Sequence, residues 1–192
     1  MRDRRLSSVE MLRPPVLAIA RGPQRPSSVS KKDCERCLTW IKPSFRWMMY
    51  RSGWGGKEGQ ETILAVEIAR VGFDWALRNA CLSHFDRDLH PDQPSWKREL
   101  KRAPARVQWD PERDLQLKPL PYRSLQLGLA GKAARRYADE WTVSVTDVTP
   151  LAHRIHGLVR EGELTAGARL LPEESGYPPG DELLERLRPS GT

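Results

Sequence analysis

Lysine and arginine side chains around one apolar segment could bind a phosphate group. Lys42 and Arg51 flank the run from Phe45 to Tyr50, and Arg51 leads into the glycine-dense loop 53–59. A cation beside a glycine-rich backbone suits phosphate, because glycine has no Cβ to hold the ligand away. Solvated surface charge is the alternative interpretation of both cations.

Two predicted strands carry the next candidates. Arg106 and Gln108 share one face of the predicted strand 106–109, because side chains alternate along a strand, and they offer a charged fork and an amide. In the predicted strand 122–127, Arg123 shares its face with leucines. A charge beside a core is unfavourable unless it is paired, so Arg123 is expected to find a carboxylate or to line a cavity.

His84 is the candidate for proton transfer. It lies at the end of a predicted helix, three residues after Cys81. A histidine in this place can donate or accept a proton near neutral pH, and it can equally serve only to cap the helix end.

These candidates lie on predicted helices and strands of modest length. We expect a single compact α+β domain over residues 34–172, with a small mixed or antiparallel sheet flanked by short helices. Residues 1–33 are rich in Arg, Pro and Ser and are predicted to be disordered, and residues 173–192 read as a polar C-terminal tail.

The composition is basic and dominated by arginine. The chain has 192 residues and a formal charge of +7, and 24 of its 32 basic residues are arginine. Arginine binds two phosphate oxygens at once, which favours a phosphate-bearing partner, although a GC-rich genome enriches arginine without any functional consequence. No apolar run approaches the ~18 residues of a membrane span and no signal-peptide core is present, so we expect a cytoplasmic protein without membrane contact.

Five strings in the sequence resemble one known family. They read TWIKPSFRWMMYRSGWG, ACLSHFD, RVQWDPERDL, LPYRSLQLGL and EWTVSVTDVTPL. Together they are similar to the family catalogued as domain of unknown function 4291, from about Thr39 to Pro172. The resemblance implies neither an activity nor a catalytic residue. Before Thr39 the sequence departs from the strand-rich stretch of the family, as a shifted reading frame or a wrong start would produce.

The cysteines give a weak metal-binding pattern. Cys34-x-x-Cys37 together with Cys81-x-x-His84 has the residue types and spacing of a four-ligand zinc site. The first pair lies in the segment that departs from the family pattern, so we expect no bound metal. An odd count of three cysteines also argues against a disulfide scaffold and favours a reducing compartment.

We therefore expect a phosphate-bearing ligand, either RNA or a nucleotide. As an enzyme the protein would be a metal-free phosphoryl- or nucleotidyl-type transferase acting on RNA. The alternative is a non-catalytic nucleic-acid or protein interaction module. An enzyme gathers its cations in one pocket, whereas a module spreads them over an open face. The residues assigned to phosphate binding are Arg51, Arg106, Gln108 and Arg123, and those assigned to catalysis are Lys42 and His84.

The sequence contains no Walker-type loop, dinucleotide fingerprint or nucleophile elbow. It leaves the cofactor, the oligomeric state and the choice between enzyme and binding module open.

Overall fold

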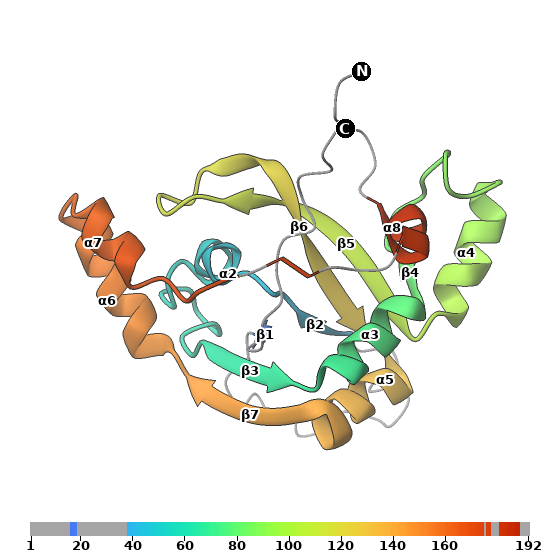
Figure 1. Ribbon diagram of the computed structural model, residues 1–192, viewed down its shortest axis with the longest axis horizontal. Helices are drawn as coiled ribbons and strands as arrows, with labels where there is room; N and C mark the ends of the chain where they lie inside the picture. The colour runs from blue at the N-terminus through green and yellow to red at the C-terminus, as the bar shows by residue number, and fades with distance from the viewer. Residues whose placement is uncertain (1–15, 19–37, 175, 178–180, 189–192) are drawn as a thin grey trace.

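The computed structural model describes residues 16–18, 38–174, 176–177 and 181–188, in which strands form two sheets (Figure 1). The first sheet is antiparallel, in the order β1 (Val16–Ala18), β3 (Leu64–Ile68), β7 (Thr142–Asp147). The second has the order β2 (Thr39–Ile41), β6 (Pro119–Leu129), β5 (Ala105–Arg113), β4 (Ala80–Leu82). Its strands pair antiparallel except for β4 and β5, which are parallel.

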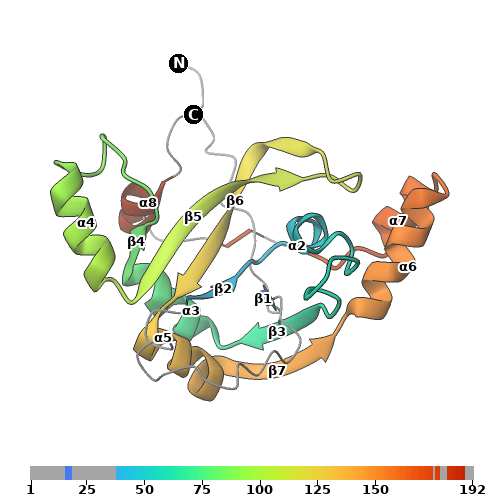
Figure 2. The same ribbon diagram turned by 180° about the vertical axis from the view of Figure 1, so that it is seen from behind.

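Helices lie around these sheets (Figures 1 and 2). They are α2 (Phe45–Ser52), α3 (Arg70–Arg78), α4 (Gln93–Arg102), α5 (Gly131–Arg136), the π-helical turn η1 (Tyr137–Trp141), α6 (Thr149–Arg160), α7 (Leu164–Arg169) and α8 (Asp181–Leu187). The α+β class predicted from the sequence is confirmed, but its strands are divided between two sheets where one was expected.

Part of the N-terminal segment predicted to be disordered can be placed. Val16–Ala18 form β1, which pairs with β3 through Val16 opposite Val66. The remainder of residues 1–33 lies outside the described residues. None of the helices that the structure describes has the length and apolar character needed to span a bilayer.

Helix α2 shows how local sequence sets an element that borders the core. Ser44 caps its first turn, because the Ser44 hydroxyl accepts from the Trp47 amide at 3.1 Å. Gly53 ends the helix with a φ of 58°, a left-handed conformation that favours glycine. Between these caps the helix buries Phe45, Met48 and Met49 against α6 residues such as Ile155.

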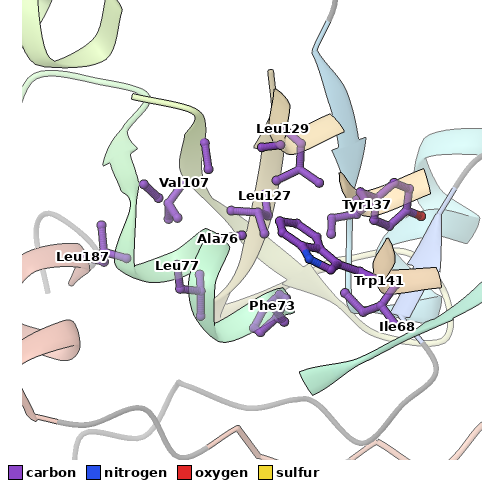
Figure 3. Packing of buried hydrophobic residues seen from close by; sticks show 14 of the residues in the cluster. Ile68, Phe73, Ala76, Leu77, Val107, Leu127, Leu129, Tyr137, Trp141 and Leu187 are labelled. Atoms are coloured by element: carbon purple, nitrogen blue, oxygen red, sulfur yellow. The ribbon is translucent and has the colours of Figure 1, made fainter. Parts of the chain in front are cut away.

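The main core lies between the four-stranded sheet and the helices α3 and α8. Figure 3 shows side chains from β3, α3, β5, β6, η1 and α8 packed together. Gly72 in α3 allows a close approach, because a Cβ there would lie 2.3 Å from Cγ of Trp141. The indole of Trp141 therefore rests against the backbone of α3.

The C-terminal residues, which the sequence predicted to be a polar tail, contribute side chains to this core. Tyr177 packs edge-on against Phe73 and its hydroxyl donates to Asp74. Leu187 in α8 is buried, and its carbonyl accepts from the indole nitrogen of Trp109 at 2.6 Å. The apolar residues Tyr177, Leu183, Leu184 and Leu187 stand in a stretch otherwise dominated by polar residues, prolines and glycines, which is why the sequence indicated a tail.

Candidate functional site

A cleft of about 670 Å³ lies along the four-stranded sheet and the loop that follows β4. Its lining residues come from β2, the segment after β4, β5 and β6, which lie side by side in Figures 1 and 2. They are Trp40, Ser83, His84, Arg106, Gln108, Trp109 and Arg123. Four of the six residues assigned to the site from the sequence are in this lining, namely His84, Arg106, Gln108 and Arg123.

The strand register explains how these residues meet. Trp40 pairs with Gly128, Gly128 with Arg106, and Arg106 with Cys81, so one row of four residues crosses the whole sheet. Residues directly opposite one another in a sheet point to the same face. After β4 the chain continues along β5, because the Ser83 amide donates to the Val107 carbonyl at 2.8 Å. This hydrogen bond holds the residue before His84 against β5, which keeps His84 near that strand.

Gly128 determines where the indole of Trp40 lies. A Cβ at Gly128 would stand 2.9 Å from Cζ3 of Trp40, too close for a carbon contact, so the ring lies on the bare backbone of β6. Trp40 is half-buried, and its ring therefore shares the cleft face of the sheet with Arg106. The arrangement puts an aromatic surface and a guanidinium in neighbouring positions.

Arg106 is the least satisfied cation of the cleft. Its Nε is buried and has no hydrogen-bond partner, and no ion pair of Arg106 exists among the described residues. Buried polar atoms in folded proteins are nearly always hydrogen-bonded, so an orphaned one needs an explanation. A bound anion would satisfy this nitrogen.

Arg123 and Gln108 are held by neighbouring groups. Arg123 is exposed, and its Nη1 donates to the Trp109 carbonyl at 3.2 Å, which leaves its other donors for a ligand. The amide nitrogen of Gln108 donates to Oδ1 of Asp110 at 2.8 Å. The amide orientation that brings this nitrogen to Asp110 turns the Gln108 carbonyl oxygen away from that carboxylate.

Lys42 is paired rather than free. It is 1% exposed, and its Nζ donates to Oδ2 of Asp110 at 3.1 Å and to the Ser124 carbonyl at 2.9 Å. Burial lowers the pKa of Lys42 to about 8, although the Asp110 carboxylate acts in the opposite direction. Lys42 is therefore absent from the cleft lining, and it acts on the cleft through Asp110, which holds Gln108.

Arg51 does not converge with the other cations. It is exposed at the end of α2 and is not part of the cleft lining. The glycine-dense loop after it folds back on the helix, because Nζ of Lys57 donates to the Arg51 carbonyl at 2.9 Å. Of the four cations assigned to the site from the sequence, Arg106 and Arg123 meet in the cleft, whereas Lys42 and Arg51 do not line it.

The sequence interpretation did not assign Trp40 to the site. Gly128, directly after the predicted strand 122–127, was the available signal, because a glycine in a strand often marks a close approach. Trp109 is a different case. It lines the cleft, but its side chain is 7% exposed and belongs to the core.

Cys81 does not have the properties of a nucleophile. It is a free, buried thiol, and burial raises its pKa to about 12, with the neighbouring Glu99 carboxylate adding to the effect. Cys34 and Cys37 of the four-ligand pattern lie outside the described residues. His84 belongs to the cleft, and the described residues within ligand distance of Cys81 are His90 and Glu99.

A known protein family matches the part of the chain that contains the cleft. A match to the family described as Domain of unknown function (DUF4291) covers residues 23–177, which is most of the chain. The chain belongs to the DUF4291 family. No curated protein and no solved structure matches it.

The DUF4291 match confirms the resemblance seen in the five sequence strings. It begins before Thr39 and ends at Tyr177, so it takes in every lining residue of the cleft and the tyrosine that packs against α3. The helix α8 lies beyond it.

Proposed function

We propose that the cleft binds a nucleotide, free or as part of single-stranded RNA, with a phosphate at Arg106 and Arg123. The observation that carries the proposal is the buried, unpartnered Nε of Arg106 in a cavity that also holds Arg123. Guanidinium groups bind phosphate oxygens through two parallel hydrogen bonds, and such charge-assisted bonds are among the strongest in proteins.

Trp40 supports a ligand with an aromatic part. Its half-exposed indole lies in the same cleft, and bases stack on tryptophan whatever their sequence. Gln108 adds an amide carbonyl that can accept from a base or a sugar hydroxyl. Phosphate-binding cations next to an aromatic ring favour a nucleotide over inorganic phosphate.

A metal-free transferase is the catalytic form of this proposal. His84 and Ser83 line the same cavity as the two arginines, so a group able to move a proton shares the cleft with the expected phosphate. In this form the arginines stabilise charge on the phosphoryl oxygens, and His84 accepts the proton of the attacking hydroxyl. Lys42 has a positioning role through Asp110.

Fluorescence anisotropy with a labelled mononucleotide and a labelled short RNA tests the binding proposal. Both probes are expected to bind, to compete with each other, and to weaken as salt rises, because phosphate contacts release counterions. Arg106→Gln is expected to weaken binding at least about tenfold, since it removes a charge-assisted contact. Arg51→Gln, which removes the same charge away from the cleft, is expected to leave affinity unchanged.

Equal losses in the Arg106→Gln and Arg51→Gln variants would show that net charge alone attracts the probes. Absence of binding at low salt would contradict the proposal outright. An interaction module with an open cationic face predicts the first of these results, because such a face has no preferred arginine.

A further inference from the structure

Three side chains of metal-binding type meet at the edge of the four-stranded sheet. A thiol sulfur of Cys81, an imidazole nitrogen of His90 and a carboxylate oxygen of Glu99 all lie within 4.8 Å of one another. They come from β4, the segment between β4 and α4, and α4 itself, and Figure 1 shows α4 beside β4. None of the three lines the cleft.

The orientation of His90 is fixed by the main chain. Its Nδ1 lies 3.0 Å from the Asp86 carbonyl and 3.3 Å from the Asp86 amide nitrogen, so it donates to the carbonyl in one tautomer and accepts from the amide in the other. Nε2 carries a lone pair in the first of these tautomers, which is the one able to bind a metal ion through Nε2. Histidines that bind metals commonly donate their other ring N–H to a carbonyl, which sets the tautomer and the ring plane.

The surroundings of the three side chains are largely closed. Cys81 is 1% exposed and His90 is 9% exposed. The ring of Phe85 lies 5.9 Å from the ring of His90 and 6.1 Å from that of Trp96, and the Trp96 indole donates to the Leu82 carbonyl at 3.0 Å. These contacts fix the segment after β4 and the start of α4 in place. Glu99 closes the group from the solvent side, where it is exposed.

We propose that Cys81, His90 and Glu99 bind a zinc ion, with a water molecule in the fourth position. Zinc takes sulfur, nitrogen and oxygen ligands in tetrahedral geometry, and sites with three protein ligands leave one position open. A thiolate and a carboxylate together balance the two charges of the ion. On binding, Cys81 loses its thiol proton to solvent as the sulfur–zinc bond forms.

Zinc at this place would join three separate pieces of chain. The segment between Cys81 and His90 contains Ser83 and His84, which line the cleft. Binding of the ion would therefore fix one border of the cleft without contacting the ligand. The competing explanation is a hydrogen-bonded cluster without metal, in which the Cys81 thiol donates to Glu99. The zinc proposal stands independently of the proposed function.

The test is zinc binding by the full chain after treatment with chelator, measured by competition with a chromophoric chelator. About one zinc ion per chain is expected to bind. Glu99→Gln keeps the shape of an exposed side chain and is expected to weaken zinc binding at least about tenfold. Glu161→Gln, at an exposed position at the end of α6, is the matched control and is expected to leave affinity unchanged.

Cobalt substitution reports the sulfur ligand directly. Co²⁺ is expected to give a thiolate charge-transfer band that Cys81→Ser abolishes and His84→Gln leaves intact. If Cys81→Ser fails to fold, the Glu99→Gln affinity still decides the proposal. Absence of zinc binding, or binding that survives Glu99→Gln, would overturn it. Binding lost in Cys34→Ser and Cys37→Ser but kept in His90→Gln would also overturn it, in favour of the four-ligand sequence pattern.

Discussion

At the scale of single residues, the composition of the cleft depends on which side chains the strands place beside Arg106. The alternation of Arg106 and Gln108 against Val107 was readable from the sequence, and the burial pattern of β5 follows it. The pairing of Lys42 with Asp110 was not readable, because 68 residues separate the two and a single acid in a turn has several candidate partners. Residue type and local spacing therefore supplied the candidate residues, while strand register decided which of them lie in one cleft.

Gly128→Ala tests whether the contact of the Trp40 indole with the bare backbone of Gly128 is needed for ligand binding. The added methyl would lie 2.9 Å from the indole, so the ring must shift, and nucleotide affinity is expected to fall several-fold. The free energy of unfolding is expected to fall by about 1–3 kcal/mol, as overpacking typically costs. Gly157→Ala in α6, where a Cβ meets nothing within 4 Å, is the control and should keep affinity and gain up to about 1 kcal/mol. Unchanged affinity in the Gly128→Ala variant would remove Trp40 from the ligand site.

Lys42 gives the protein a specific dependence of stability on pH. Its pKa is lowered to about 8 in the folded protein from 10.5, so between these values the unfolded chain holds a proton that the folded protein has lost. The contribution of Lys42 to stability is therefore expected to rise as pH increases across this window. Denaturant unfolding from pH 7 to 10.5 is expected to show that rise in the native protein relative to Lys42→Met. Parallel pH profiles for the two proteins would contradict it.

At the scale of elements, caps and strand alternation were predictable from sequence, but sheet membership was not. Ser44 and Gly53 bound α2 as their residue types indicate. The strands β3 and β7 pair with each other, yet nothing in their local sequence says that they do so rather than pair with β5. Their pairing leaves the hairpin of β5 and β6 in the other sheet, with β2 and β4 at its edges.

Leu187→Ala tests whether α8 belongs to the core. Leu187 is 4% exposed and packs in the main cluster, so its truncation is expected to lower the free energy of unfolding by about 2–4 kcal/mol. Leu164→Ala is the matched control, because Leu164 is 37% exposed and should lose less than about 1 kcal/mol. Chemical denaturation measures both. If both variants lost a similar, small free energy of unfolding, α8 would not be part of the core.

At the scale of the whole molecule, the charge of +7 attracts anions to the surface but does not say where they bind. Arg106 and Arg123 meet in the cleft. Lys42 is instead buried and paired with Asp110, and Arg51 is exposed at the end of α2. A compact cleft that holds an arginine with a buried, unpartnered Nε favours a specific ligand over a diffuse cationic face. The family match and the fold leave the reaction open, so the ligand is the first quantity to establish.

The most direct test of the central claim is the NMR signal of the Arg106 side chain during titration with a mononucleotide. The Nε–Hε cross peak of Arg106 is identified by its absence from the Arg106→Lys variant. We expect this peak to shift strongly as the nucleotide binds, because the orphaned Nε gains an anionic partner. The Arg51 peak is expected to stay in place. Binding that moves the Arg51 peak, or binding that leaves the Arg106 peak unmoved, would contradict the account.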